Sequence, residues 1–354
     1  MEEEIEVMNW LREKKLKESF NQLEEVKHKS KTEGKLFAVR DLQKYEKLYE
    51  LVKFLKWGNL GYPYCIKFGI TNRCYCRCSM CNMWKSKPKI DLKKDTILKA
   101  IEDGNTKTVV FMGGEPMSYE PFDDFLNLLT QIKLMQVDIG IITSGTPPKR
   151  FTSKVMDHIT NTCRWIRFSL DASNPKTYKL QRGVDAFNSV VEEIKYFRNK
   201  IDMRINFTIW RDNVDDVLNM NSFAKSLGVP IKFWKANFYT LPPEKEIEFI
   251  KELDWFEFKK SPAKNCWIPH LVCQIDEKGD VYGCCHVYDP MRERHTEFIQ
   301  GNIYKDNMYT IFNSKRAKKI REIMWNRPIS ACNDCSADSL NWYIENHKDI
   351  DVFL

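Results

Sequence analysis

The stretch that decides the fold is Thr71-Asn72-Arg73-Cys74-Tyr75-Cys76-Arg77-Cys78-Ser79-Met80-Cys81. It follows an apolar segment, Tyr64–Ile70, that is typical of a buried strand. Cys74, Cys78 and Cys81 have the spacing C-x3-C-x2-C, and three thiolates can hold three irons of a [4Fe–4S] cluster. The fourth iron then lacks a protein ligand, and an open metal position is where chemistry can occur. A structural zinc ion would need Cys76 as its fourth ligand, but we expect Cys76 to bind no metal.

Composition excludes several classes of protein. Of 354 residues, 43% are hydrophobic and 30% are charged, which supports a folded core and argues against disorder. The chain contains no apolar run long enough to span a membrane. Its start, Met1-Glu2-Glu3-Glu4, is not a secretory signal, so we expect a cytoplasmic protein. The net charge of +7 comes without a basic cluster interleaved with aromatics, so we expect no nucleic-acid partner.

Most of the 12 cysteines fall into two groups. A chain in a reducing compartment keeps its thiols reduced, so grouped cysteines favour metal binding over disulfides. The first group is the loop quoted above. The second follows residue 265 and contains Cys266, Cys284, Cys332 and Cys335. Four thiolates can saturate a second [4Fe–4S] cluster, although a zinc ion would also accept this ligand set.

Strands and helices alternate regularly after residue 62. The expected strands are Tyr64–Ile70, Thr108–Met112, Val137–Thr143, Trp165–Leu170, Met203–Ile209 and Ile231–Lys235. The expected helices are Leu92–Glu102, Phe122–Leu134, Thr152–Ile159, Ala186–Asn199 and Val214–Ser226. This alternation predicts a parallel sheet, and six strands suit a partial (β/α)6 barrel of the α/β class.

Two further regions flank the expected barrel over 62–240. Residues 1–61 show helical periodicity and are predicted to form a helical extension. Residues 241–354 lose the alternation. They are predicted to hold a linker and a small domain with a hairpin (Leu271–Ile275, then Val281–Cys284) and a helix near 314–324.

The cysteine loop after the first strand resembles the radical S-adenosylmethionine (radical SAM) superfamily. The resemblance implies that the open iron chelates SAM, whose reductive cleavage gives a 5′-deoxyadenosyl radical that abstracts a hydrogen atom from substrate. The cofactors then carry the hard chemistry, and the protein supplies position and shelter from water. An electron donor such as flavodoxin or ferredoxin is implied as a partner.

Further segments resemble the SAM-binding motifs of this family, and most end a predicted strand. Gly113-Gly114-Glu115-Pro116 matches the motif that contacts the SAM amino group. Ser144 stands where relatives often have asparagine, and its hydroxyl could reach the SAM ribose or carboxylate. Ser169 and Asp171 are candidate ribose contacts, although Ala172 replaces the usual glycine. Arg182, in an Arg-Gly pair, is expected to bind the SAM carboxylate, an anion that suits its planar fork.

The second cysteine group resembles the twitch or SPASM auxiliary domain of the same superfamily. The full SPASM form continues with two further cysteines after the last C-x2-C pair, and no cysteine follows Cys335. The resemblance therefore implies one fully ligated auxiliary [4Fe–4S] cluster, bound by Cys266, Cys284, Cys332 and Cys335. Cys285 is not expected to be a ligand, because neighbouring strand side chains point to opposite faces.

Catalytic residues are less defined. His270 and His286 could act as a general base for a substrate proton. Cys163, Cys273, Cys285 or Cys65 could donate a hydrogen atom to a substrate radical, although each is also typical of a small buried hydrophobe.

Several functions remain open from the sequence. Our first hypothesis is oxidation of a polar small molecule with the auxiliary cluster as electron acceptor, since the cysteine spacing resembles that of an aminocyclitol dehydrogenase. The alternative is peptide modification by epimerisation or thioether formation, and a third option is maturation of a cofactor in another protein. A non-enzymatic iron–sulfur electron carrier would leave the Glu115 and Arg182 segments unexplained.

Overall fold

The computed structural model describes residues 61–210, 212–235, 265–284, 287, 295–328 and 332. The predicted N-terminal helical extension lies outside these residues apart from Gly61. Cys285, His286 and Cys335 also lie outside them. The domain boundaries at 61 and 240 therefore stay predictions.

The described strands form one nine-stranded sheet in the order β6-β5-β4-β3-β2-β1-β7-β8-β9. Neighbours from β1 to β6 all pair in parallel, as the alternation predicts. Each expected strand is present, with its ends shifted by at most two residues. These strands are β1 (Cys65–Thr71), β2 (Thr108–Gly113), β3 (Asp138–Thr143), β4 (Trp165–Ser169), β5 (Asp202–Ile209) and β6 (Ile231–Lys235).

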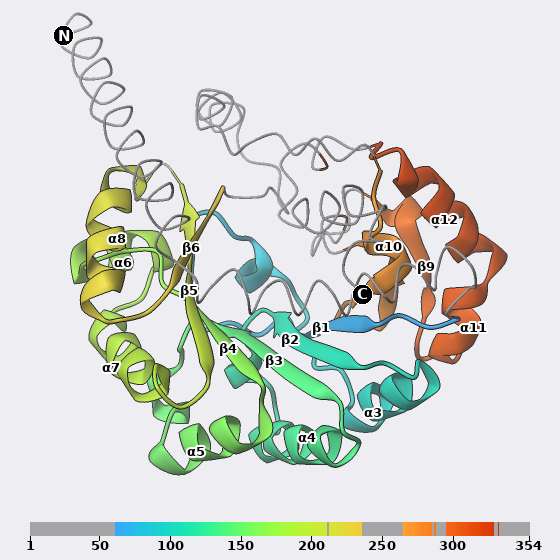
Figure 1. The fold of residues 1–354 in the computed structure, drawn as a ribbon, viewed down its shortest axis with the longest axis horizontal. Helices are drawn as coiled ribbons and strands as arrows, with labels where there is room; N and C mark the ends of the chain where they lie inside the picture. Colours follow the sequence, from blue (N-terminus) through green and yellow to red (C-terminus); the bar gives the residue numbers. More distant parts are fainter. Residues whose placement is uncertain are drawn as a thin grey trace, which may run out of the picture.

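Helices follow the strands and cover the outer side of the curved sheet (Figure 1). They are α3 (Lys94–Asp103), α4 (Phe122–Leu134), α5 (Ser153–Thr162), α6 (Pro175–Arg182), α7 (Phe187–Phe197) and α8 (Val217–Ser226). Short 3-10 helices lie between them: η1 (Met83–Lys85), η2 (Pro116–Ser118), η3 (Pro148–Arg150) and η4 (Val214–Asp216). Helix α6 is absent from the sequence prediction because its apolar periodicity is weak. Local capping begins it, since the Asn174 side chain accepts the Thr177 N–H (2.9 Å).

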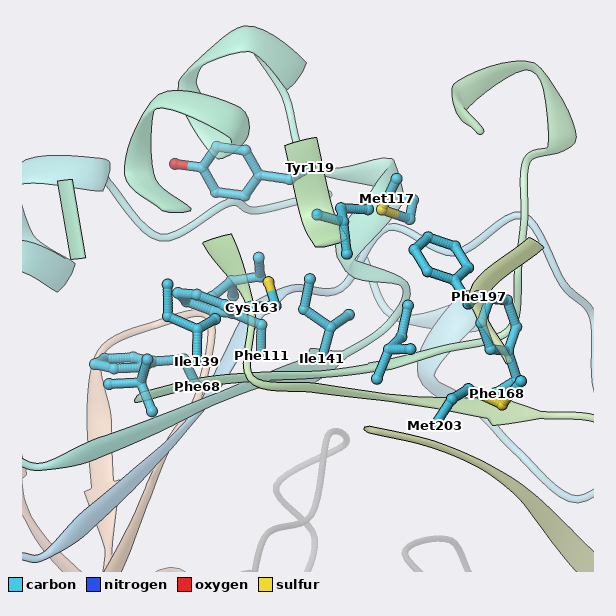
Figure 2. Packing of buried hydrophobic residues seen from close by; sticks show 14 of the residues in the cluster. Phe68, Phe111, Met117, Tyr119, Ile139, Ile141, Cys163, Phe168, Phe197 and Met203 are labelled. Carbon is cyan, nitrogen blue, oxygen red and sulfur yellow. The ribbon is translucent and has the colours of Figure 1, made fainter. Parts of the chain in front are cut away.

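The main core lies between the sheet and these helices (Figure 2). Phe111 on β2 is fully buried and packs edge-on against Phe125 of α4, with ring centroids 5.6 Å apart. Phe168 on β4 packs against Phe197 of α7, with ring centroids 5.8 Å apart and the rings tilted by 42°. Aromatic rings from alternate positions of the strands therefore fill the outer layer and leave the strand ends free for polar residues.

The C-terminal region continues the same sheet. After α10 (Ile268–Leu271), β7 (Val272–Ile275) pairs in parallel with β1, with Ile66 opposite Cys273. Strands β8 (Asp280–Tyr282) and β9 (Ile299–Asn302) follow in antiparallel pairing. The expected hairpin and helix are confirmed, whereas the pairing with β1 was not anticipated. The other elements are η7 (Thr296–Phe298), α11 (Met308–Asn313) and α12 (Lys315–Trp325).

The hairpin turn is built as its sequence indicates. The Asp276 carboxylate accepts the N–H groups of Lys278 and Asp280, each at 2.9 Å. Gly279 has φ +83°, a conformation that favours glycine. The turn thereby places β8 next to β7 and fixes the position of Cys284 two residues beyond the strand.

Candidate functional site

The loop after β1 is closed at its base by Asn72. This fully buried side chain accepts the N–H of Ile90 and donates to the carbonyl of Pro88, both at 2.8 Å. Beside it, Arg73 forms an ion pair with Asp91 at 2.7 Å. These contacts tie the start of the loop to its end, so the four cysteines between them are held at the carboxyl end of β1.

Gly114 joins the second motif to the cysteine loop. Its N–H donates to the carbonyl of Thr71 (2.7 Å), and the N–H of Glu115 donates to the carbonyl of Arg73 (2.8 Å). A Cβ atom on Gly114 would lie 2.2 Å from the Arg73 carbonyl oxygen, so a side chain there is excluded. Gly113 has φ +121°, which also favours glycine. The two glycines thus permit a backbone contact that no other residue type would allow.

The Glu115 carboxylate is a fully buried acceptor at the ends of β2 and β3. One oxygen accepts the Thr143 hydroxyl (2.6 Å) and the Met117 N–H (3.1 Å). The other accepts the Ser144 N–H (2.6 Å) and hydroxyl (2.5 Å). Burial raises the pKa of Glu115 to about 7, and the hydrogen bonds from Ser144 and Thr143 oppose this shift. The structure thereby brings Glu115 and Ser144 together, with Ser144 oriented by Glu115.

A hydrogen-bond chain continues from Ser144 to the cysteine loop. The hydroxyls of Ser144 and Thr146 lie 2.7 Å apart, and the Thr146 hydroxyl lies 3.4 Å from the sulfur of Cys76. Cys76 is fully buried. The third strand end and the cysteine loop are therefore linked through polar side chains.

Asp171 and Arg182 form a buried ion pair beside Cys78. Their closest atoms, Oδ2 and Nη2, are 2.5 Å apart, and Arg182 Nη1 donates toward the Cys78 sulfur at 3.6 Å. The other Asp171 oxygen accepts the N–H of Thr208 at 2.6 Å. Burial raises the pKa of Asp171, while the Arg182 guanidinium opposes that rise. Ser169, the remaining candidate ribose contact, lies half-buried at the end of β4.

The end of α6 also holds the cysteine loop through its backbone. The N–H of Arg77 donates to the carbonyl of Arg182 (2.8 Å), and the N–H of Ser79 donates to that of Gln181 (3.1 Å). Gly183 follows with φ +68° and closes the helix. Two backbone hydrogen bonds thus hold the cysteine loop against the helix end that carries Arg182.

The donor set of this loop fits an iron–sulfur cluster. Cys74, Cys76 and Cys78 interact with one another, and Cys81 is close enough to Cys78 to affect its pKa. Cys74, Cys78 and Cys81 could each supply a thiolate to a different iron of a [4Fe–4S] cluster.

The second cysteine group lies next to the first. Cys266 and Cys284 are buried in a small apolar cluster that also contains Met83, and Cys81 packs against it. The Cys266 N–H donates to the carbonyl of Trp325 (3.1 Å), and the Arg327 side chain donates to the carbonyl of Cys332. Residues of the two motifs, more than 180 positions apart in the chain, therefore share one packed region.

Among the candidate catalytic side chains that the structure describes, Cys163 and Cys273 are buried, whereas His270 and Cys65 are half-buried. The His270 ring packs tilted against Trp267 and edge-on against Trp325, and burial lowers its pKa to about 4. Burial raises the pKa of Cys163 and of Cys273 to about 12 each. Cys163 lies in the core between sheet and helices, as a small hydrophobe would (Figure 2). Cys273 lies on β7 beside β1.

Glu193 on α7 is a further buried acid that sequence reasoning overlooked. It is 5% exposed, and a Cβ on Gly145 would meet its Oε2 atom at 2.6 Å. Burial, assisted by the charge of Glu115, raises the pKa of Glu193 to about 9. Its signal in the sequence is an acidic residue on the apolar face of the predicted helix, between Val190 and Phe197. Asn72, Thr143 and Thr146 were also overlooked, although each lies next to a motif.

Comparison with known proteins identifies the chain. The radical SAM superfamily profile matches residues 68–224, and that of the SPASM iron–sulfur cluster-binding domain matches residues 266–336. The chain belongs to the radical SAM superfamily, and it carries a SPASM-type domain after the catalytic one. It is an enzyme, and its two domains imply SAM and [4Fe–4S] clusters, one cluster in each domain.

Individual relatives are distant. The GTP 3′,8-cyclase of Aliarcobacter butzleri is 25% identical over 48% of this chain and 54% of its own length, so the match spans about half of that relative. The mycofactocin maturase MftC of Mycolicibacterium smegmatis is 22% identical over 78% of this chain and 76% of its own. The crystal structure of Streptococcus suis SuiB bound to S-adenosylmethionine has a TM-score of 0.57 at 15% identity and covers 92% of this chain and 83% of that one. No helix among the described residues is long and apolar enough to cross a membrane.

Replacing Cys74, Cys78 and Cys81 by alanine together should remove one cluster and leave the other. Iron analysis after anaerobic reconstitution should fall from about eight irons per chain to about four. The Cys163→Ala variant is the matched control and should keep both clusters, since that thiol lies in the apolar core. Full iron content in the triple variant would contradict the assignment of the three ligands.

Glu193→Gln should change how stability depends on pH. Glu193 has a pKa of about 9 when folded and an ordinary value near 4.5, so the folded state binds the extra proton between these values. Stability should therefore fall as pH rises from 5 to 8, by up to about 4 kcal/mol from this group alone. The glutamine variant should lose that part of the slope in denaturant titrations. Glu192→Gln, an exposed neighbour, should keep the wild-type slope, and identical slopes in all three proteins would contradict the prediction.

Proposed function

We propose that this radical SAM enzyme oxidises its substrate and that the SPASM-type domain accepts the electron which the substrate gives up. The observation that supports this is the packing of Cys81 and Met83 against Cys266 and Cys284 in one apolar cluster. A radical formed near the first group of cysteines would lie close to the second, which suits electron transfer. The full set of four candidate ligands also leaves no vacancy for a substrate at the second cluster.

The cysteine spacing and the motifs at the strand ends support our assignment of the residues that would hold the cofactors. We assign the first cluster to Cys74, Cys78 and Cys81, and the second to Cys266, Cys284, Cys332 and Cys335. Gly113, Gly114, Glu115, Ser144, Ser169, Asp171 and Arg182 border the carboxyl ends of β2, β3 and β4 and their loops, where SAM would bind. When bound, the first cluster and SAM supply a 5′-deoxyadenosyl radical that takes a hydrogen atom from substrate, and the second cluster supplies a site for the released electron.

The chain's own residues would position and shelter these groups. The backbone hydrogen bonds from Gly114 and Glu115 hold the start of the cysteine loop against the end of β2. The buried Glu115 carboxylate would accept an N–H from the SAM amino group in place of the Met117 N–H, the longest of its four hydrogen bonds. His270 is neutral at pH 7 because of its lowered pKa and could take the substrate proton if it reaches the substrate. His286 is the second candidate for that proton.

A peptide is the substrate we favour. The maturase MftC matches over 78% of this chain, and SuiB, which has been solved with its precursor peptide SuiA, shares the fold. A polar small molecule is the second candidate, because the GTP 3′,8-cyclase matches 48% of this chain at 25% identity. We also propose a cytoplasmic location, with flavodoxin or ferredoxin as electron donor.

Glu115→Gln should weaken SAM binding without loss of iron. Removing one charge-assisted hydrogen bond costs roughly 1.5–3 kcal/mol, which corresponds to about a 10- to 150-fold weaker affinity. Calorimetric titration of the reconstituted protein with SAM measures this change. Glu120→Gln, an exposed carboxylate beyond the same motif, is the matched control and should bind SAM as the wild type does. Equal affinity in all three proteins would exclude Glu115 as a SAM contact.

Oxidation can be separated from epimerisation by product mass. Short peptides encoded beside the gene, and a panel of aminocyclitols and nucleotides, would be incubated with enzyme, SAM and reductant in ordinary and deuterated water. We expect a product lighter by two hydrogen atoms from a peptide, and no such product from Cys332→Ala although that variant still cleaves SAM. A product of unchanged mass in ordinary water that gains one deuterium at carbon in deuterated water would overturn oxidation. A lighter product formed only from the small molecules would overturn the peptide assignment.

A further inference from the structure

We propose that the Asp171–Arg182 ion pair sets the reduction potential of the first iron–sulfur cluster through Cys78, with Arg182 raising the potential and Asp171 lowering it. This inference rests on the proposed assignment of Cys78 as a cluster ligand. It gives Arg182 a role that operates before SAM binds, in addition to its expected contact with the SAM carboxylate.

The contacts of the guanidinium support this role. Arg182 Nη1 donates toward the Cys78 sulfur at 3.6 Å, and Nη2 lies 2.5 Å from Asp171 Oδ2. The Arg182 side chain is 8% exposed and that of Asp171 is fully buried. Because little water surrounds this charge, its electrostatic interaction with a ligand sulfur at this distance is only weakly screened. The remaining donor, Nε, is buried without a hydrogen-bond partner among the described residues, so it stays available for SAM.

The direction of each effect follows from charge. Reduction adds one negative charge to a cluster, and hydrogen bonds and positive charge at the ligand sulfurs favour the reduced form. The Arg182 guanidinium supplies both a hydrogen bond and a positive charge at the Cys78 sulfur. Asp171 carries the opposite charge on the same guanidinium, so it offsets part of this effect. Removing one member of the pair should therefore shift the potential in one direction, and removing the other should shift it in the opposite direction.

The backbone makes this contact a fixed feature of the loop. The N–H of Arg77 donates to the Arg182 carbonyl, and the N–H of Ser79 donates to the Gln181 carbonyl, on either side of Cys78. A Cβ on Gly183 would lie 2.7 Å from the Cβ of Arg77, so the two segments approach as closely as glycine permits. These backbone bonds hold the Cys78 segment beside the helix end that carries Arg182, and the ion pair with Asp171 orients the guanidinium.

The chain contains a matched control pair. Arg167 on β4 is also buried and also forms an ion pair, with Asp202 at 3.1 Å. Asp202 begins β5, at the end of the sheet opposite the cysteine loop, and the Arg167 guanidinium lies over the ring of Trp165. Substitutions in this pair disturb a buried arginine and its acid without altering the charge near Cys78.

The test is a redox titration of the reconstituted full chain without SAM, followed by electron paramagnetic resonance. The signal that changes shape when SAM is then added identifies the first cluster. We expect Arg182→Met to shift this cluster to a lower potential and Asp171→Asn to shift it to a higher one. Arg167→Met and Asp202→Asn should leave it at the wild-type value. Arg182→Lys, which keeps the charge but loses the fork, should shift it less than Arg182→Met does.

Asp171→Asn preserves shape, and its remaining oxygen can still accept the Thr208 N–H, so it remains informative if Arg182→Met fails to fold. Wild-type potential in Asp171→Asn, with the first cluster intact by iron analysis, would overturn the inference. Weaker SAM binding in Arg182→Met at an unchanged SAM-free potential would also overturn it, and would assign Arg182 to SAM alone. Failure of the underlying ligand assignment is distinguishable, because Cys78→Ala would then keep its full iron content.

Discussion

The parallel pairing of β1 with both β2 and β7 is the constraint on which the site depends. The carboxyl ends of parallel strands meet at one edge of a sheet, so motifs that follow β1 and β2 become neighbours. The cysteine loop follows β1, and Gly114 follows β2. Strand β7 adds the C-terminal region on the other side of β1, between Cys266 and Cys284 in the chain. One strand thereby brings the Gly113–Glu115 segment and both cysteine groups into one region of the molecule.

Buried polar contacts, rather than apolar packing, give the site its shape. Glu115, Asp171 and Arg182 are each at least nine-tenths buried. A buried charge is costly unless it is paired or hydrogen-bonded, so each of these groups fixes the residues around it. The Glu115 carboxylate accepts the Ser144 hydroxyl. The Arg182 guanidinium pairs with Asp171 and donates toward the Cys78 sulfur. Glu193 Oε2 is buried without a hydrogen-bond partner among the described residues, and burial raises the pKa of Glu193 to about 9, which favours the protonated acid at neutral pH.

The sequence predicts the parts of this structure that depend on local pattern. Strand periodicity gave all six parallel strands, and the cysteine spacing led to the family that the comparisons confirm. Helix α6 was overlooked because capping by Asn174 begins it, rather than a strong apolar stripe. The pairing of β7 with β1 joins residues about 200 positions apart, and no local pattern encodes such a contact. The partner of Arg182 was unpredictable for the same reason, since Asp171 and Cys78 meet it only through the tertiary fold.

The pairing of β1 with β7 also limits how the C-terminal domain of this enzyme could be replaced by that of a relative. Cys65 faces Val272 and Phe68 faces Ile275 in a register of four residue pairs. A slip of one residue would turn the side chains of β7 to the opposite faces of the sheet. An auxiliary domain from a relative could therefore be joined to this catalytic core only if its first strand kept the same residue register with β1. The boundary between the two domains lies within one sheet, between β1 and β7. A flexible linker could not replace the hydrogen bonds of that strand pair.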